Sequence, residues 1–282
     1  MEAYQQLLFP YAYNILGSVE DAKDVVQEVV SKYYTTSREG VNDEKNYLIR
    51  SVINLAINTK NRNKQVSAAT PEWLPEPVAT DDNADKNINM KDILSYSLMV
   101  LMERLSTMER AVFILRESFD YDHKEIAAVL SISEEYSRKL LSRAKTRLFK
   151  PGPAVRTAAQ QQQTSRLLAD YIDAIRQGDV KRLESMLYSE VTMVADGGQL
   201  KVVRKITEGV TDVLEILQII YTRYLSKAEV TFRWVNHQPA FVYTYKGRVV
   251  TCQIFDVSED GNTILRINNV VDPNKLKQFV IE

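Results

Sequence analysis

The sequence is poor in the residues that build metal centres and disulfides: it has one cysteine, Cys252, and two histidines, His123 and His237, in 282 residues. A single cysteine excludes an internal disulfide framework and a cysteine-based zinc site. Two histidines that lie far apart in the chain argue against a histidine-rich metal centre. We therefore expect no metal and no other cofactor.

Long apolar runs are also missing. No stretch reaches the roughly 18 consecutive apolar residues that a membrane helix needs, and the N-terminal segment lacks the basic lead and apolar core of a signal peptide. The chain also lacks an excess of charge of either sign, since 36 Lys and Arg are balanced by 37 Asp and Glu, which gives a net charge of −1. This balance excludes a uniformly basic nucleic-acid coat protein. These absences predict a cytoplasmic protein without contact to a membrane.

Apolar residues make up 45% of the chain, which is enough for ordinary cores, and its length corresponds to about two domains. Residues 1–65 show the helical spacing of apolar side chains. Residues 66–90 contain three prolines and several acidic residues, which predicts a linker. Helical patterns resume over 91–150 and end at the Pro-Gly-Pro sequence of 151–153.

The pattern changes after this break. Two amphipathic helices are predicted around residues 167–175 and 210–224. The β-rich runs are 191–195, 230–235, 241–245, 249–257 and 264–271. Lys-Gly at 246–247 and Asp-Gly at 260–261 are typical of hairpin turns between the last three runs. Helices with a curved antiparallel sheet make residues 151–282 an α+β domain.

Residues 122–148 carry a helix-turn-helix signal. A capping box at 122–125 opens a short helix, a tight connection follows at 131–132, and a second helix runs from Ser133 to about residue 148. In the second helix the side chains predicted to pack inward are Tyr136, Leu140, Leu141, Ala144 and Leu148. Six basic residues and no acidic residue lie between 138 and 150. Such a helix suits the major groove of DNA, although a solvated basic helix in a bundle has the same pattern.

A second basic block covers residues 45–64, with five basic residues, no acid, Tyr47 and several asparagines. A cationic helix with an aromatic at its start could hold a single DNA strand by phosphate contacts and base stacking. The same spacing also fits an ordinary solvated helix face, with Tyr47, Leu48 and Ile53 in the core. The residues alone leave both interpretations open.

Together these segments resemble a bacterial extracytoplasmic-function (ECF) sigma factor. LGSVEDAKDVVQEVVSKYY at 16–34 is similar to the sigma-two segment that docks on the RNA polymerase clamp. YLIRSVINLAINTKNR at 47–62 is similar to the segment that opens and reads the −10 element. Residues 105–148 are similar to sigma-four, with one departure at Ser131, where a turn glycine is usual.

The resemblance implies an all-α N-terminal half, with a sigma-two helical bundle at 1–65 and a sigma-four helix-turn-helix domain at 91–150. RNA polymerase core and promoter DNA are the implied partners. The residues implied at the polymerase are Asp24, Gln27 and Glu28. Those implied at the −10 DNA are Arg50, Asn54, Asn58, Lys60 and Arg62. Those implied at the −35 DNA are Arg138, Lys139, Ser142 and Arg143.

A narrower resemblance concerns three short motifs. Residues 73–77 match the WLPEP linker motif of the ECF41 group, whose members carry a C-terminal SnoaL-like domain with the NTF2-like cone fold. The group's DGGG motif is DGGQ here, and its NPDKL motif is DPNKL. The regulatory residues implied by these matches are Trp73, Leu74, Pro75, Glu76, Pro77, Asp196, Gly197, Gly198, Asp272, Pro273, Lys275 and Leu276. In this group the fused domain stands in for a separate anti-sigma protein, which implies autoregulation by residues 151–282.

Two other functions fit parts of the sequence. A one-component transcription regulator would join the helix-turn-helix to a ligand-sensing cone, but it has no use for a polymerase-docking helix in its N-terminal 63 residues. A SnoaL-like enzyme fused to a DNA-binding unit would need an acid/base pair in the cone, for which Asp196 and His237 are the candidates. A cone filled with Tyr, Phe and Val is equally well a packed core or a pocket for a small-molecule ligand, and this alternative stays open.

Overall fold

The computed structural model describes residues 2–35, 43–67, 73–81, 90–148, 158–200, 202, 206–277 and 279. The chain folds into two compact units. The helical unit comprises Met1–Thr70 and Ala84–Pro151, and the cone unit comprises Pro71–Asn83 and Gly152–Glu282. The WLPEP segment therefore belongs to the cone unit, although it lies between two halves of the helical unit in sequence. Much of the predicted 66–90 linker, and the Pro-Gly-Pro break, lie outside the described residues.

Three helices form the first part of the helical unit: α1 (Glu2–Leu16), α2 (Val19–Thr35) and α3 (Glu44–Ser67). Gly17 separates α1 from α2, because its φ of 76° favours glycine and its amide closes the helix end on Tyr13 O at 2.7 Å. Ser18 caps α2 by accepting from Asp21 N at 3.2 Å, as the sequence predicts. The predicted apolar side of α2 is buried.

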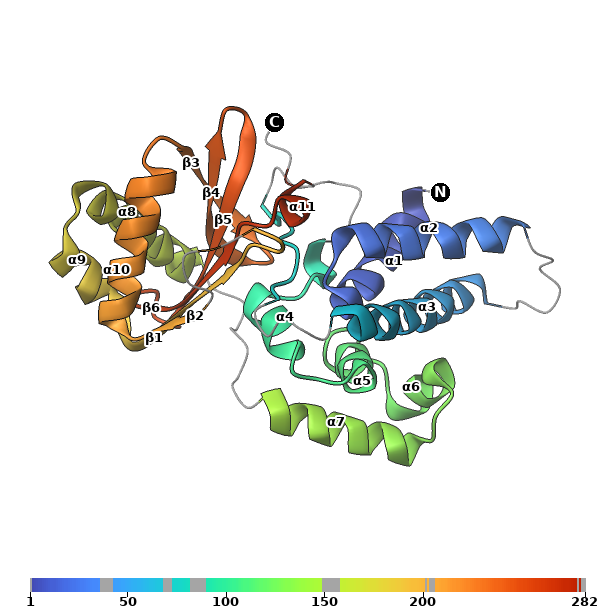
Figure 1. Cartoon of the computed structure of the whole chain (residues 1–282). Helices are drawn as coiled ribbons and strands as arrows, with labels where there is room; N and C mark the ends of the chain where they lie inside the picture. Colours follow the sequence, from blue (N-terminus) through green and yellow to red (C-terminus); the bar gives the residue numbers. More distant parts are fainter. Residues whose placement is uncertain are drawn as a thin grey trace. The chain divides into compact units, whose positions relative to one another are not determined.

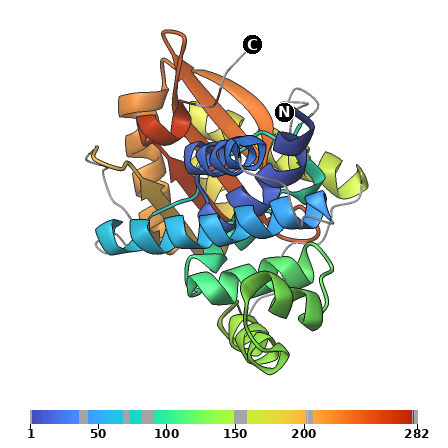
Figure 2. The ribbon, with the colours of Figure 1, turned by 90° about the vertical axis from the view of Figure 1, so that its right-hand side faces the viewer.

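The second part of the helical unit contains η1 (Met90–Asp92), α4 (Tyr96–Met102), α5 (Thr107–Glu117), α6 (His123–Leu130) and α7 (Glu134–Leu148). A capping box between Ser106 and Glu109 begins α5, and one between Asp122 and Glu125 begins α6. The second of these confirms the predicted start of the helix-turn-helix. Figures 1 and 2 agree in placing α5, α6 and α7 along one side of α3.

The cone unit packs α8 (Ala158–Gln177), α9 (Val180–Met186) and α10 (Val210–Ile220) against one face of a six-stranded sheet (Figure 1). The strands are β1 (Leu187–Asp196), β2 (Ile206–Glu208), β3 (Glu229–Val235), β4 (Gln238–Tyr245), β5 (Arg248–Val257) and β6 (Ile264–Val270). Their spatial order is β2-β1-β6-β5-β4-β3. A π-helical turn, Tyr221–Leu225, extends α10. This arrangement confirms the expected α+β, NTF2-like cone.

The sequence predicts an antiparallel sheet, and this prediction is wrong for one pair of strands. Strands β1 and β6 run parallel, with Met193 opposite Ile267. After β1 the chain passes through β2 and α10 to the far edge, and the β3-β4-β5-β6 meander then returns to β1. Asn236 and His237 form the two-residue hairpin between β3 and β4, both at positive φ. This turn has no glycine, so the usual hairpin signal is missing.

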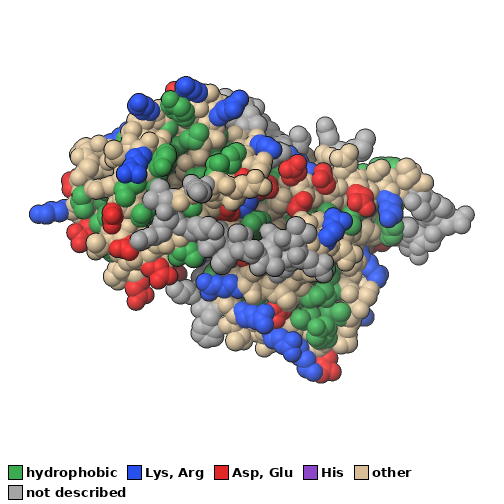
Figure 3. All heavy atoms as spheres, viewed as in Figure 1, with side chains coloured by type: hydrophobic (Ala, Val, Ile, Leu, Met, Phe, Trp, Pro, Cys, Tyr) green, Lys and Arg blue, Asp and Glu red, His purple; other side chains and the backbone are tan. Residues whose placement is uncertain are grey.

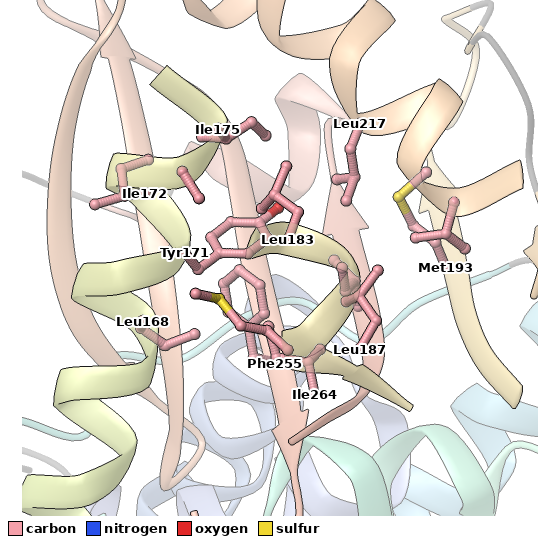
Figure 4. Packing of buried hydrophobic residues seen from close by; sticks show 14 of the residues in the cluster. Leu168, Tyr171, Ile172, Ile175, Leu183, Leu187, Met193, Leu217, Phe255 and Ile264 are labelled. Carbon is pink, nitrogen blue, oxygen red and sulfur yellow. The ribbon is translucent and has the colours of Figure 1, made fainter. Parts of the chain in front are cut away.

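The core of the cone unit lies between its helices and the sheet (Figure 4). Tyr171 of α8 is fully buried, with its ring centroid 6.3 Å from that of Phe241 and 5.1 Å from that of Phe255. Burying an apolar side chain of this size stabilises the fold by roughly 1.5–3 kcal/mol. This packing fixes the sheet that carries the C-terminal motifs.

Candidate functional site

Helix α7 presents the basic face that the sequence predicts, and Figure 3 shows Lys and Arg side chains gathered over it. Its exposed residues include Arg138, Lys139, Ser142 and Arg143. Tyr136 is 42% exposed, so its predicted inward position is wrong. Ser137 is buried in its place, with its Oγ 2.9 Å from His123 Nδ1.

The basic side chains of α7 differ in how strongly their ion pairs hold them in place. Arg138 and Lys139 each pair with a glutamate one turn earlier, at 2.8 and 2.7 Å, with side chains 57% and 62% exposed. Such exposed pairs are worth about 0.3–0.5 kcal/mol, so phosphate oxygens can replace the glutamates at little cost. Arg147 instead fixes α7 to α5 through Glu109 at 2.6 Å. Burial raises the pKa of Glu109, but hydrogen bonds from Ser106 and the Arg147 charge outweigh it and lower the pKa.

Helix α3 brings two of its predicted −10 residues against the end of α6. Arg50 Nη2 donates to Ser131 Oγ at 3.0 Å, and Asn54 Nδ2 donates to Val129 O at 3.3 Å. Ser131 adopts the left-handed conformation that ends α6, with φ 55° and ψ 46°, so the turn closes without a glycine. The helix-turn-helix therefore occupies part of the α3 surface that the sequence assigns to DNA.

The other three −10 candidates divide between surface and core. Asn58 and Arg62 are exposed, but Lys60 is only 6% exposed. Lys60 Nζ donates to Leu16 O at 3.0 Å and to Glu103 Oε1 at 3.1 Å. A buried ammonium would have to leave both partners to reach a phosphate, at a cost of several kcal/mol.

Glu103 lies at the centre of a charge network inside the helical unit. Arg110 is fully buried, pairs with Glu103, and donates from its Nε to Asn14 O at 2.8 Å. Burial raises the pKa of Glu103, but the charges of Arg110 and Lys60 outweigh it and hold the pKa below its usual value. Sequence analysis missed this network. The signal in the sequence that could have revealed the network is Arg110, a charged residue that lies beside Ala111 on the apolar side of α5.

The predicted polymerase residues share one surface of α2. Asp24, Gln27 and Glu28 are exposed, whereas the valines between them are buried. Gln27 also lines an apolar hollow of about 440 Å³, to which Val26 and Tyr34 contribute. The structure thus brings these three residues together on an accessible helix face beside a concave apolar surface.

The three short motifs converge on one cluster of contacts, which we call the linker clasp: Trp73, Leu74, Asp196 and Lys275. Lys275 Nζ lies 2.6 Å from Asp196 Oδ2 and donates to Leu74 O. Leu74 N donates to the same carboxylate at 2.8 Å. Lys275 Nζ also lies 4.2 Å from the ring centroid of Trp73. Both charged groups are about nine-tenths buried, at 9% side-chain exposure each.

The glycines of the DGGQ motif keep the clasp compact. Gly198 has a φ of 57°, its amide donates to Asp196 Oδ1 at 2.9 Å, and a Cβ there would lie 2.2 Å from Asp272 Oδ2. A Cβ at Gly197 would come within 2.7 Å of its own loop. Asp272 in turn caps α11 (Pro273–Leu276) by accepting from Asn274 N at 2.9 Å. This cap positions Lys275, and the α11 side chain of Leu276 is buried with it.

The chain beyond the clasp adds to the free edge of the sheet. Pro75, Glu76 and Pro77 are buried. Asn236 N then donates to Val78 O at 2.8 Å, and Thr80 N donates to Trp234 O at 2.8 Å, in an antiparallel bridge on β3. Residues 73–81 are thus held by the cone unit along their whole length.

Sequence analysis missed the groups on β3 that receive this segment. Asn236 Oδ1 accepts from Val78 N at 2.9 Å, and Arg233 pairs with Asp81 at 2.9 Å. Hydrogen bonding to Asp81 raises the pKa of Arg233. Only the fold could reveal these pairs, because about 150 residues separate the partners in sequence.

The acid/base pair considered for an enzyme does not form one site. Asp196 is committed to Leu74, Gly198 and Lys275, whereas His237 is exposed in the β3–β4 turn. Among the described residues, no group of three His, Cys, Asp or Glu side chains could hold a metal ion. Within the same residues, no helix is long and apolar enough to cross a bilayer.

Comparison with known families assigns the two parts of the helical unit. Residues 1–66 match sigma-70 region 2, and residues 95–148 match sigma-70 region 4. Two regions of this type, in this order, define a chain of the sigma-70 class. The region 4 match covers the helix-turn-helix, and the region 2 match covers α1 to α3.

Similarity to curated proteins narrows the assignment within the sigma-70 class. The chain is 27% identical over 228 residues to the ECF RNA polymerase sigma factor SigJ of Mycobacterium tuberculosis, covering 79% of this chain and 72% of SigJ. It is 26% identical to the probable ECF sigma factor SigI of that organism, covering 66% of this chain and 64% of SigI, and 26% identical to SigG, covering 67% and 58%. Together with the two region matches, these similarities support an ECF sigma factor.

The solved structures add the fold of the whole chain. The crystal structure of Mycobacterium tuberculosis SigJ matches with a TM-score of 0.76 at 24% identity, covering 98% of this chain and 96% of SigJ. This match extends over the cone unit as well as the helical unit, so the combination of both is a shared architecture. The ECF41 subgroup stays a prediction.

Proposed function

We propose that this chain is a promoter-specific initiation subunit of RNA polymerase that is restrained by its own cone unit. The observation that carries the proposal is the linker clasp. It joins the segment between region 2 and region 4 to both C-terminal motifs. Because this segment connects the two DNA-binding regions, a domain that holds the segment can control both regions.

The helical unit supports the same proposal. The −10 and −35 elements lie about 25 base pairs apart, or roughly 85 Å along B-DNA at ~3.4 Å per base pair. The Arg50–Ser131 hydrogen bond instead holds the two regions in contact, at 3.0 Å. Region 2 and region 4 cannot read both elements at once while this contact persists. The closed arrangement described here is therefore the restrained state, and promoter binding requires it to open.

In the open state we assign Asp24, Gln27 and Glu28 to the polymerase. We assign the −10 element to Arg50, Asn54, Asn58, Lys60 and Arg62, and the −35 element to Arg138, Lys139, Ser142 and Arg143. Lys60 takes part only after it leaves Glu103. The motif matches support our proposal that this behaviour is that of the ECF41 group, where a fused SnoaL-like domain replaces a separate anti-sigma protein.

The test compares matched variants of the full chain in transcription with core RNA polymerase. Lys275→Met removes the clasp cation, and Lys277→Met removes an exposed lysine two residues later. We expect Lys275→Met to change transcription from the cognate promoter, as does a chain that ends near Phe149, whereas Lys277→Met behaves as wild type. Equal transcription by all four proteins contradicts regulation by the cone. Failure of every protein to bind core polymerase contradicts the initiation function itself.

A further inference from the structure

An exposed surface at one end of the cone unit joins aromatic rings to basic side chains. Tyr224 is 61% exposed and Tyr245 is 42% exposed. Both border the same apolar hollow, so they are neighbours in space although they come from the turn after α10 and from the end of β4. We call this surface the tyrosine patch and define it by the two tyrosines and the four basic residues beside them, Arg223, Lys227, Lys246 and Arg248.

The π-helical turn Tyr221–Leu225 explains why Tyr224 is exposed. Continued α-helical spacing would place Tyr224 on the same side of α10 as Val213 and Leu217, which are buried. The wider π turn delays the helical phase by about one residue, so Leu225 is buried instead, at 5% exposure. Such turns are rare and recur at functional sites. The backbone thus adopts an uncommon conformation that presents this ring to solvent.

The basic residues of the patch lie next to the two rings. Lys246 Nζ is 5.4 Å from the ring centroid of Tyr245. Arg248 is directly opposite Tyr245 in the β4–β5 register, so the two side chains share one face of the sheet. Arg223 and Lys227 lie on either side of the exposed tyrosine of the π-helical turn in sequence. Figure 3 shows Lys and Arg side chains among hydrophobic ones at the upper end of the cone unit, where Figure 1 has the β4–β5 hairpin.

The positive charge of the patch is not compensated within the described part of the chain. Three other cations of the cone unit each pair with an aspartate: Arg182, Arg233 and Lys275. The four patch cations form no ion pair with a described residue. The segments that carry them, 221–228 and 243–251, contain no Asp or Glu. Glu229 follows the first segment, but it is opposite Thr244 and therefore lies on the other face of the sheet from Tyr245.

We propose that the tyrosine patch binds single-stranded DNA, with phosphates at the basic side chains and unpaired bases stacked on Tyr224 and Tyr245. Surfaces that hold single strands combine cations that follow the backbone with exposed rings that stack on bases. Duplex DNA would use the cations alone, because its bases are already stacked on one another. The choice of DNA rests on the proposed function, because an initiation subunit acts where promoter strands are separated.

An anionic bilayer attracts the same cations, but the form of the patch does not suit one. Binding in the membrane interface buries a continuous apolar face. Here the rings border a hollow, which a flat bilayer does not enter, and the hairpin tip beside them is the charged pair Lys246–Gly247. The patch therefore fits a flexible strand better than a membrane.

The test locates the contact by photocrosslinking, because region 2 and region 4 of the full chain are also assigned to DNA. A thymidine strand of about 12 nucleotides carries 4-thiothymidine at its centre, and mass spectrometry identifies the crosslinked peptides. We expect crosslinks at Tyr224 and Tyr245. Their yield as a function of protein concentration gives the affinity of this surface alone.

The rings are tested one at a time. Tyr224→Ser should weaken the affinity measured at Tyr245 by roughly 5- to 100-fold, because a stacked base contributes about that factor. Tyr224→Phe keeps the ring and should bind as wild type does. Tyr188→Ser, at a β1 tyrosine that is 45% exposed, is the control, and all variants should share one thermal unfolding midpoint. Equal affinity of Tyr224→Ser and Tyr224→Phe overturns the stacking contact.

The cations determine the salt dependence. Each phosphate contact on a single strand contributes about 0.7 to the slope of log affinity against log salt concentration. Arg223→Gln combined with Arg248→Gln should therefore reduce the slope measured at Tyr245 by about 1.4. Arg166→Gln combined with Lys181→Gln removes two exposed cations of α8 and α9 and should leave the slope unchanged. An unchanged slope in the patch variant overturns the phosphate contacts.

Other outcomes overturn the proposal as a whole. Absence of crosslinks at both tyrosines does so, and so does an equal yield with duplex DNA of the same length. Displacement of the strand by poly-glutamate as effectively as by unlabelled strand would assign the patch to an acidic protein, and displacement by vesicles of anionic lipid would assign it to a membrane. Core polymerase is absent from all of these measurements, so their failure is distinguishable from failure of the proposed function.

Discussion

Replacing Lys275 by methionine should release the linker from the cone without unfolding the cone. The substitution keeps the length and apolar body of the side chain but removes its charge. It thereby breaks the ion pair with Asp196, the hydrogen bond to Leu74 O and the cation–π contact with Trp73.

The size of the effect follows from the burial of the pair. Removing one partner of a buried ion pair costs about 3–5 kcal/mol, because the other charge stays behind. Asp196 keeps its bonds from Leu74 N and Gly198 N, so we take the lower end, about 3 kcal/mol. At 1.4 kcal/mol per factor of ten, local opening at Leu74 becomes roughly 100-fold more frequent.

Hydrogen exchange of the Leu74 amide measures this opening directly, because that amide donates to Asp196. Its protection should fall by about two orders of magnitude, while the amide of Phe255 in the cone core exchanges as before. Lys277→Met, at an exposed position, is the control and should leave both amides unchanged. Adding Asp196→Asn to Lys275→Met should restore part of the protection, because no unpaired charge is then buried.

Two results would refute this reasoning. Unchanged protection of Leu74 in Lys275→Met would mean that the proline-fixed backbone and the β3 contacts hold the segment without the clasp. An equal loss of protection at Phe255 would mean that Lys275 stabilises the whole cone, and that the clasp is not a local element.

The other predictions concern the helical unit. Arg138→Ala and Lys139→Ala should each weaken −35 binding by about 1–3 kcal/mol where a base contact is lost, measured by promoter titration at fixed salt; normal transcription by both would contradict the role of α7. Reversal of Asp24 and Glu28 to lysine should abolish binding to core polymerase with an unchanged circular dichroism spectrum, and wild-type affinity would remove the docking role. Glu103 has a lowered pKa in the folded protein. Its contribution to stability is therefore present above pH 4.5, the usual pKa of a glutamate, and is lost as the pH falls through the lower pKa of the folded state. The melting temperature should therefore fall more steeply with acid in wild type than in Glu103→Gln, and equal slopes would contradict the network.

Local rules were enough for much of the helical unit. Capping residues and 3.6-residue spacing predicted the start of α6 at Asp122 and the buried side of α2, because both depend on neighbours within one helical turn. Tyr136 was misplaced because periodicity gives the direction of a side chain but not the width of the core beneath it. The structure places Ser137 there instead, against His123.

The candidate functional residues fall into the same two groups, those that the local sequence determines and those that only the fold brings together. The sequence by itself determined the exposed basic face of α7, the exposed acids of α2 and the three motifs, since these depend on residue type and helical phase. Only the tertiary structure decided that Lys60 is buried against Glu103, that Arg50 contacts Ser131, and that Lys275 joins Leu74 to Asp196. Each of these pairs is separated by 43 to 201 residues. No local pattern encodes such a distance, because burial and pairing of a charge depend on what the rest of the chain packs around it.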